Sequence, residues 1–291
     1  MRFARNNKPE RGFTLIEMLA ALGIFLLITG TAFTLLTSSQ QRYQTESQVL
    51  NSFQEARLGL DQMVRDINDA GYPPPSYLAA PNNPYNHLAI VPFAWSAGRG
   101  YFANPCQVGT GGLGNCTTAG GGFAPGDFDI IIETNTDPSR DPACAPTCPV
   151  QWIRYQLGGP NGTTLMRGAA DKQSGQDPDT VTINVGLAPF VENVVNNSPN
   201  LQIGQFQLFA AYPALFPGGA PVPIFQYICD TPIVPQSPLP LCQNALADNS
   251  PANIRDVMIT LIVAAPLPDS TTGRPRLVQL SGRGRRINPN Q

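Results

Sequence analysis

Two hydrophobic patterns follow one another near the start of the chain. From Phe13 to Leu36 the side chains are almost all apolar, and Glu17 is the only ionisable one. From Val49 to Ile67 apolar residues recur every three or four positions on a polar background, which is typical of an amphipathic helix. Because the first proline after these segments is Pro73, we predict one helix from about Phe13 to about Ala70.

The apolar segment is long enough to cross a bilayer. As a helix it rises about 36 Å, against a hydrocarbon core of about 30 Å. Basic residues outnumber the single acid, Glu10, in the dozen residues before it, and these are Arg2, Arg5, Lys8 and Arg11. The positive-inside rule therefore predicts a single span with the N-terminus in the cytoplasm and the rest of the chain exported.

A cleaved secretory signal is the alternative interpretation of this segment. The best small-residue site is "TGTA", from Thr29 to Ala32. Signal peptides usually have an apolar core of about 7–15 residues, whereas this core is longer and contains an acid. We therefore favour a retained helix whose first half, 13–36, spans the membrane and whose second half, 37–71, is amphipathic.

The remainder, residues 72–291, is predicted to be a β-rich globular region. Several short segments are β-branched and alternate in polarity, which is typical of strands. They are 127–134, 150–157, 163–168, 180–185, 201–212, 254–265 and 276–282. The glycine-rich turn from Gly158 to Gly162 would join the second and third as a hairpin. A helix on one face of an antiparallel sheet predicts an α+β fold.

Long loops are expected between these strands, because the chain has 30 prolines and 27 glycines. The two stretches without a clear element are 73–126 and 213–251. Six cysteines lie beyond the span as three sequence-local pairs, Cys106/Cys116, Cys144/Cys148 and Cys229/Cys242. If this part of the chain is exported, it enters an oxidising compartment in which disulfides form. Six cysteines allow 15 connectivities, and we expect the local pairs to form disulfides that staple these loops.

Net charge argues against nucleic acid as a main partner. The whole chain has 18 basic and 20 acidic side chains, and without residues 1–12 the acidic excess grows to five. Five arginines near the C-terminus are the exception, namely Arg274, Arg276, Arg283, Arg285 and Arg286. A basic surface for an acidic subunit or DNA is one interpretation, and a solvated strand and tail is the one we favour.

The stretch "RGFTLIEMLAALGIF", from Arg11 to Phe25, resembles the type III signal of type IV pilins and type II secretion pseudopilins. The resemblance implies a leader of residues 1–12, which prepilin peptidase removes between Gly12 and Phe13. It also implies that the new amine of Phe13 is N-methylated. The fold would then be pilin-like, with the long helix packed on an antiparallel sheet.

Looser similarities place the chain near minor pilins of the PilW type, which are related to J-type pseudopilins. They are "LDQMVRDINDAGY" (60–72), "WIRYQL" (152–157) with "TTLMRG" (163–168), and "TGRPRLVQLSGRGRRINP" (272–289). This resemblance implies an inner-membrane subunit with a periplasmic globular region, later assembled into a pilus. Its partners would be other pilins and minor pilins, prepilin peptidase and the inner-membrane assembly platform.

The resemblance also suggests a role for Glu17. A charged carboxylate at mid-bilayer costs about 2.5–3.5 kcal/mol on insertion scales, so an acid in this segment needs a reason. The resemblance to pilins implies that Glu17 pairs with the Phe13 amine of a neighbouring subunit. A displaced subunit would then leave the carboxylate of Glu17 buried without a positive partner. An interfacial acid without a role is the alternative.

No motif predicts catalysis, a metal or a cofactor. "GTGGLG" (109–114) matches a dinucleotide fingerprint but follows no convincing strand, and His87 is the only histidine, which disfavours zinc and hydrolase sites. A group of acids offers oxygen ligands for calcium, although its spacing matches no EF-hand. These acids are Asp127, Asp129, Glu133, Asp137 and Asp141.

We therefore expect a non-enzymatic minor pilin that primes or caps a type IV pilus. A type II secretion pseudopilin of the J type is the alternative within the same superfamily. A membrane-anchored adhesin or binding protein that never polymerises is the alternative from another class.

Overall fold

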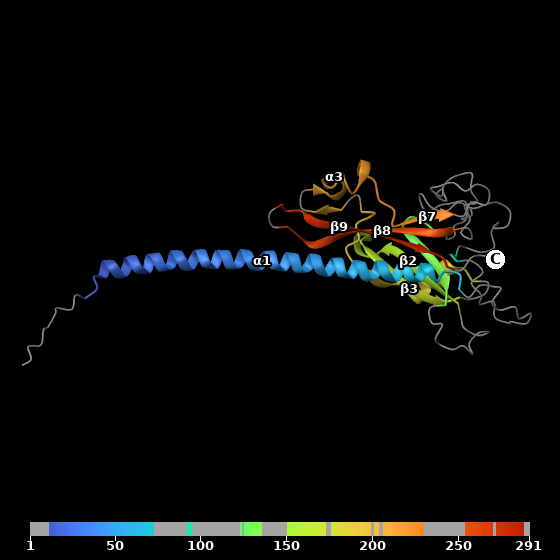
Figure 1. Ribbon diagram of the computed structural model, residues 1–291, viewed down its shortest axis with the longest axis horizontal. Coiled ribbons are helices and arrows are strands. Elements are labelled where there is room, and N and C mark those ends of the chain that lie inside the picture. Colours follow the sequence, from blue (N-terminus) through green and yellow to red (C-terminus); the bar gives the residue numbers. More distant parts are fainter. Residues whose placement is uncertain are drawn as a thin grey trace, which may run out of the picture. The chain divides into compact units, whose positions relative to one another are not determined.

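The computed structural model describes residues 12–72, 92–94, 123, 125–135, 150–172, 176–198, 201–203, 206–229, 254–269 and 272–287. The chain divides into an N-terminal unit, Met1–Ser47, and a head unit, Gln48–Gln291. Helix α1 runs without interruption from Leu15 to Asn68, so it supplies elements to both units (Figure 1). The long helix predicted from the two hydrophobic patterns is present, and antiparallel sheets follow it.

The first sheet of the head unit has the strand order β1-β2-β3-β4, and every neighbouring pair is antiparallel. Its strands are β1 (Asp129–Thr134), β2 (Gln151–Gly158), β3 (Thr164–Asp171) and β4 (Ala188–Val191). The predicted hairpin between β2 and β3 is confirmed, with a short 3-10 turn, η4 (Pro160–Gly162), at its tip. Gly159, at φ 73°, and Gly162, at φ 66°, take left-handed conformations in this turn that favour glycine.

The second sheet has the order β7-β8-β9 and is also antiparallel. Strand β7 (Phe225–Cys229) pairs with the long β8 (Ile254–Pro268), which forms a hairpin with β9 (Pro275–Arg285). The two sheets are joined by an isolated bridge between Val194 and Val263. A further pair, β5 (Gln202–Ile203) and β6 (Phe206–Gln207), leads into helix α3 (Leu208–Ala211) and the 3-10 turn η5 (Pro217–Gly219).

The main core lies where the second half of α1 meets both sheets. Four residues of the predicted apolar stripe are buried there, and they are Ala56, Leu60, Met63 and Ile67. They share one cluster with side chains of β1, β2 and β3 and with those of β7 and β8. The inner residues of β1 alternate, so that Ile130 and Ile132 join this core while Ile131 packs on the opposite face with Trp152. The α+β fold class is therefore confirmed.

Helix α1 approaches β9 closely because two glycines of that strand face it. An added Cβ at Gly284 would lie 2.5 Å from Cγ2 of Ile67, and one at Gly282 would lie 2.9 Å from Cδ1 of Leu60. Both distances are shorter than carbon atoms tolerate without movement. The sequence "SGRGR" thus provides a groove on β9 into which the apolar stripe of α1 fits.

Gly284→Ala is expected to lower the free energy of unfolding of the head by about 1–3 kcal/mol, because overpacking forces α1 or β9 to shift. Gly158→Ala is the matched control, since its added Cβ would lie 3.8 Å from Met166, an ordinary contact. Denaturant unfolding of both variants measures the difference. Equal stability of the two variants would contradict the close approach of helix and strand.

Two predicted strands are wrong. Residues 178–185 form helix α2 (Pro178–Val185), although "TVTINV" is β-branched. Its ends explain the difference: the Asp177 side chain accepts a hydrogen bond from the backbone N–H of Asp179, Pro178 occupies the first turn, and Gly186 at φ 96° ends the helix. These end signals outweigh the weak strand preference of the residues between them.

The second wrong strand is 201–212, which is extended only in β5 and β6. In α3, Leu208 and Phe209 are both buried in one cluster, and the Phe209 ring stacks on Phe216 with centroids 4.1 Å apart. A strand would point these two consecutive side chains to opposite faces. Strand β7, in contrast, lies in a stretch for which we predicted only a loop.

The cysteine predictions are mostly outside the described residues. Cys229, at the end of β7, is disulfide-bonded and buried. The other five cysteines, Cys106, Cys116, Cys144, Cys148 and Cys242, lie outside the described residues. The pairing of Cys229 with Cys242 and the two remaining local pairs therefore stay predictions.

Candidate functional site

The start of α1 brings together residues that the sequence singled out. Gly12, Phe13 and Thr14 precede the helix in extended or irregular backbone, and the Phe13 side chain is 91% exposed. The carbonyl of Thr14 accepts the first helical hydrogen bond, from the N–H of Met18. Thr14 is therefore the N-cap of α1, and Glu17 occupies the third helical position.

Glu17 and Thr14 form a reciprocal capping box. The backbone N–H of Thr14 donates to Oε2 of Glu17 at 3.0 Å, and the Thr14 hydroxyl donates to the same oxygen at 2.8 Å. The N–H of Glu17 donates in turn to the Thr14 hydroxyl at 3.4 Å. Each side chain thus satisfies a backbone donor that the first helical turn leaves without a partner. The carboxylate of a single chain is held at the very start of the helix.

The surface that follows Glu17 is apolar and exposed. Among the residues described, α1 is the one helix long and apolar enough to cross a membrane, and none of its most apolar stretch is buried in the molecule. Large side chains from Leu15 to Leu36 all face outward. Exposed surface of this extent needs lipid or protein around it, which supports membrane anchoring.

Four threonines near the end of the apolar segment satisfy their hydroxyls within the helix. Thr29 donates to the carbonyl of Phe25 at 2.7 Å, and Thr34 donates to the carbonyl of Gly30 at 2.9 Å. Thr31 and Thr37 make equivalent bonds one turn back. These internal bonds allow polar side chains to lie in an apolar environment without a free donor.

A buried carboxylate holds α1 on the first sheet of the head unit. Asp66 lies on the inner side of the helix, and its Oδ2 accepts from the hydroxyl of Tyr155 on β2 at 2.6 Å. Arg167 on β3 donates to the same oxygen at 3.0 Å and to the Tyr155 hydroxyl at 2.9 Å. Gln62, one turn earlier on α1, donates to Oδ1 at 2.8 Å. This Asp66 latch is a charged, hydrogen-bonded contact between helix and sheet.

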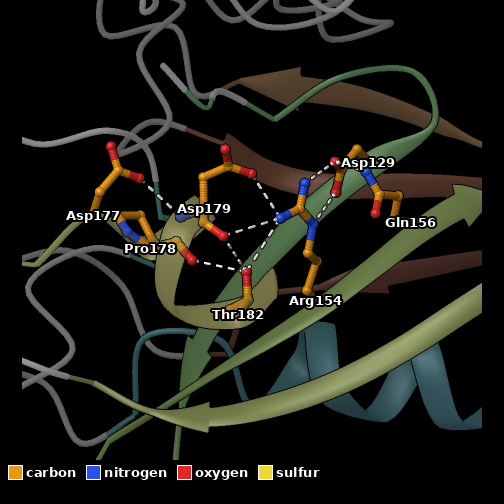
Figure 2. Close-up of polar contacts among 7 residues, drawn as sticks. All are labelled: Asp129, Arg154, Gln156, Asp177, Pro178, Asp179 and Thr182. Carbon is orange, nitrogen blue, oxygen red and sulfur yellow. Dashed lines mark hydrogen bonds and ion pairs between the residues drawn. The ribbon is translucent and has the colours of Figure 1, made fainter. Parts of the chain in front are cut away.

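A second network, on the opposite face of that sheet, is centred on Arg154 of β2 (Figure 2). Its guanidinium makes a bidentate contact with Asp129 on β1, with Nε 3.0 Å from Oδ1. Nη1 donates to Oδ1 of Asp179 at 2.7 Å and to the hydroxyl of Thr182 at 3.2 Å, both on α2. Figure 2 shows the arginine lying between the strand carboxylate and the helix. Arg154 therefore attaches α2 to the sheet.

Burial dominates the electrostatics of this network. Removal from water raises the pKa of the Asp129 carboxyl to about 6, although hydrogen bonds from Arg154 and Gln156 lower it, and the nearby Asp179 charge raises it. The Arg154 pKa is also raised, because hydrogen bonds and charge attraction to both carboxylates outweigh burial. The guanidinium stays charged, and the ionisation state of Asp129 changes near neutral pH.

Two further carboxylates are buried and paired with basic side chains in the head unit. Glu133 accepts from the Trp152 indole at 3.0 Å and from the Lys172 ammonium at 2.8 Å. Asp256, which is fully buried on β8, accepts from Arg283 at 2.8 Å and lies 4.0 Å from Arg285. Hydrogen-bonded pairs of this kind fix which strand faces which neighbour, and they are structural contacts.

The acids considered for calcium do not converge in the described part of the chain. Asp129 and Glu133 pair with Arg154 and Lys172, and no group of three or more metal-binding side chains occurs among the described residues. Asp137, Asp141, His87 and "GTGGLG" lie outside those residues. Of the C-terminal arginines, Arg276 pairs with Asp269, and Arg283 with Asp256.

Asp66 and Arg154 were not predicted from the sequence. Asp66 did leave a signal, because an acid directly before Ile67, in the apolar stripe of α1, has to find a partner when that face is buried. Arg154 left none, since its partners lie 25 residues away in either direction and only the fold brings them together. The Thr14–Glu17 pair was visible as T-x-x-E, the pattern of a capping box.

Comparison with known proteins gives one match. The prokaryotic N-terminal methylation motif matches residues 7–33, which include the end of the expected leader, the capping box and most of the apolar segment. No curated protein and no solved structure matches the chain. The motif indicates a prepilin-like chain, either a type IV pilin or a pseudopilin. It implies processing by prepilin peptidase and association with pilins and a membrane.

Proposed function

We propose that the chain is a minor pilin of the PilW type, which is held in the inner membrane and then assembled into a type IV pilus to prime or cap the filament. The observation that supports this most directly is the methylation motif over residues 7–33 together with the exposed, apolar first half of α1, which begins within that motif. A helix with that surface suits lipid before assembly and neighbouring helices afterwards. In this proposal the chain has no catalytic role.

Processing would prepare the N-terminal site for assembly. Cleavage between Gly12 and Phe13 creates a positively charged amine about 6 Å along the helix axis from Glu17. In a dry helical bundle an unpaired carboxylate is costly, so Glu17 would favour the one register that places the Phe13 amine of a neighbouring subunit beside it. N-methylation keeps that amine charged. Thr14 would hold the carboxylate in place until the neighbour arrives.

The head unit would follow the helix during assembly because it is attached at several points. The Asp66 latch joins α1 to β2 and β3, and the glycine groove joins α1 to β9. At the end of the helix, the Asn68 side chain accepts from the N–H of Arg285, and its carbonyl accepts from Ile287. Displacement of the second half of α1 therefore displaces both sheets of the head unit.

The test is the presence of the chain in filaments and the effect of its loss. Sheared, purified pili from the native strain should contain the chain at low abundance relative to the major pilin, as measured by quantitative mass spectrometry. A deletion strain should have few or no pili, and expression of the intact chain should restore them. Filaments that lack the chain, together with normal piliation of the deletion strain, would contradict the proposal.

The methylation motif is shared with pseudopilins, so a J-type pseudopilin of type II secretion is the second candidate. Loss of secretion in the deletion strain, with twitching and DNA uptake unchanged, would favour it. A non-polymerising membrane-anchored adhesin is the candidate outside the superfamily. A Glu17→Ala chain that inserts into the membrane and works normally would favour that function.

A further inference from the structure

Strand β9 is an outer strand of the second sheet, and in the described part of the chain β8 is the one strand paired with it. The N–H of Arg286, just after β9, donates to the carbonyl of Arg255 at 3.1 Å, and Arg285 lies opposite Asp256. Backbone groups alternate in direction along an antiparallel strand. The even-numbered residues of β9 therefore bond to β8, and the odd-numbered residues point their N–H and C=O groups outward. We call this outward row the β9 edge.

The β9 edge is closed at both ends and open between them. At one end, Asn68 of α1 accepts from the N–H groups of Arg285 and Ile287. At the other end, Pro275 has no N–H, and its carbonyl accepts from the Tyr212 hydroxyl. Between these ends, no hydrogen bond to another described residue satisfies the outward backbone groups of Leu277, Gln279, Ser281 and Arg283. This open section is about 20 Å long, which is the length of an average strand.

The open section lacks the features that usually prevent an edge from pairing with another chain. Proteins protect such edges with charged side chains, prolines and bulges. The sequence from Leu277 to Gly282 contains no charged residue and no proline, and the register of β9 with β8 is regular there. Gln279 and Ser281 are exposed, so solvent reaches the edge. These properties suit the addition of a strand from a partner.

Two arginines of β9 give one end of the edge a positive charge. Arg283 and Arg285 lie on the side of the sheet that faces away from α1, next to the buried carboxylate of Asp256. Arg283 donates to that carboxylate at 2.8 Å, whereas Arg285 is 4.0 Å from it and its side chain is 66% exposed. One carboxylate therefore faces both guanidinium groups, and a positive charge remains exposed beside the edge.

Helix α1 adds basic side chains on the same border. Arg57, Asp61 and Arg65 are exposed and lie one turn apart, in the row that ends at Asn68. Asn68 bonds directly to the end of the β9 edge. Four arginines thus border this edge with two aspartates, and they are Arg57, Arg65, Arg283 and Arg285 with Asp61 and Asp256. The surplus positive charge favours an acidic partner.

The two faces of the sheet favour different side chains on an added strand. A residue directly opposite Ser281 or Arg283 would place its side chain on the same face as these two. The next residue of the added strand would point to the face of α1, where Val278 and Leu280 are half-buried. An acidic side chain suits the first position, and an apolar side chain suits the second.

We propose that the β9 edge, from Leu277 to Arg283, binds an extended acidic segment of a partner protein as an added antiparallel strand. Acidic and apolar residues alternate in this segment, and the acidic ones lie beside Arg283 and Arg285. A second copy of the chain would bring the same positive charge to the edge, so the partner is a different protein. The proposal goes beyond the assembly role and does not depend on the kind of filament.

The test measures binding of a short fluorescein-labelled peptide that alternates glutamate and valine to the full chain in detergent micelles. Ser281→Pro removes an outward N–H and leaves the bonds to β8 in place. Ser281→Thr is the matched control, because it keeps that N–H. Fluorescence anisotropy should show equal affinity for Ser281→Thr and the unsubstituted chain, and about tenfold weaker binding or less for Ser281→Pro. Equal binding by the two variants would contradict the proposed position.

Two N-methylated peptides test strand addition without any change to the protein. A glutamate opposite Ser281 exchanges both backbone bonds with it, so the glutamate N–H groups face β9 and the valine N–H groups face away. Methylation of the glutamate amides should abolish binding, whereas methylation of the valine amides should leave it largely intact. Equal binding of the two methylated peptides would overturn the added strand.

The identity of the occupant is tested by charge and by the mass of the chain. A peptide that alternates lysine and valine should bind about tenfold more weakly than the glutamate peptide, because it adds positive charge beside the arginines. Equal affinity for the two peptides, or no binding of the glutamate peptide, would overturn the acidic partner. A dimer in micelles that Ser281→Pro converts to a monomer would assign the edge to a second copy and overturn the proposal.

Discussion

Glu17→Gln is expected to abolish incorporation of the chain into filaments while leaving the start of α1 unchanged. Glutamine at the third helical position still accepts hydrogen bonds from Thr14, so the capping box persists. It has no charge, however, and the Phe13 amine of the neighbouring subunit is then buried without a partner. Loss of one member of a buried ion pair costs about 3–5 kcal/mol, which is more than about a hundredfold in an equilibrium constant.

Thr14→Val is the matched control, because it removes the hydroxyl bond and keeps the charge of Glu17. This variant should still assemble, with at most a modest loss from the weakened helix cap. Quantification of each variant in sheared filaments, against its amount in the membrane, measures the effect. Assembly of Glu17→Gln at the level of Thr14→Val would show that the charge is dispensable.

Arg154→Ala is expected to lower the free energy of unfolding of the head unit by about 3 kcal/mol, the lower end of the range for breaking a buried ion pair, because it removes a buried cation from between two half-buried carboxylates. Asp129 and Asp179 both bond to this guanidinium, and α2 is attached through it. Denaturant unfolding of the full chain in detergent, monitored by fluorescence, measures the loss. In this variant α2 should detach from the sheet before the sheet itself unfolds.

The destabilisation should depend on pH in a defined direction. The pKa of Asp129 in the folded chain is about 6, above the ordinary value, so the folded state binds this proton more tightly than the unfolded state. Stability contributed by that proton is present below the unfolded pKa and is lost as the pH rises through the folded value. Without Arg154 the pKa of Asp129 in the folded chain rises further. The Arg154→Ala variant should therefore have a much lower free energy of unfolding at pH 8 than at pH 5.

Two further variants separate the ion-pair explanation from a general packing defect. Arg276→Ala removes an exposed pair with Asp269, since Arg276 is 52% exposed, and should cost about 0–1 kcal/mol. The double variant Asp129→Asn/Arg154→Ala should lose most of the pH dependence between pH 5 and 8. An Arg154→Ala variant as stable as Arg276→Ala, or equally unstable at both pH values, would contradict the role of Arg154.

The elements with strong periodic patterns could be predicted from the sequence. The stripe from Val49 to Ile67 specifies one buried face of a helix, and its members from Ala56 to Ile67 do enter the core. The apolar run of β1 and the alternation of β8 and β9 specify strands in the same way. In each case the local pattern and the tertiary environment favour the same structure, which makes the prediction safe.

The elements that were missed depend on residues outside the pattern. Helix α2 is determined by Asp177, Pro178 and Gly186 at its ends, whereas the residues between them favour a strand. Strand β7 alternates Phe225, Tyr227 and Cys229 towards the core, but it is short and lies in a proline-rich stretch. The Arg154 network needs β1, β2 and α2 in place before its distances have any meaning. Local sequence carries no information on such a contact.

The N-terminal site shows the opposite situation, because all of its residues lie within six positions. Gly12, Phe13, Thr14 and Glu17 form a signal that needs no fold to be recognised, and the capping box between Thr14 and Glu17 follows from their spacing alone. What the spacing does not supply is the neighbouring subunit. The pairing of Glu17 with the amine of a second chain is a proposal, and the Glu17→Gln variant tests it.

Mass spectrometry of the mature N-terminus, on the chain purified from membranes of its native host, tests the account most directly. We expect a chain that begins at Phe13 with a methylated amine and retains the whole of α1. A chain that begins near Phe33, after the small-residue site from Thr29 to Ala32, would have lost Glu17 and the span. That result, or an uncut chain beginning at Met1, would contradict the account.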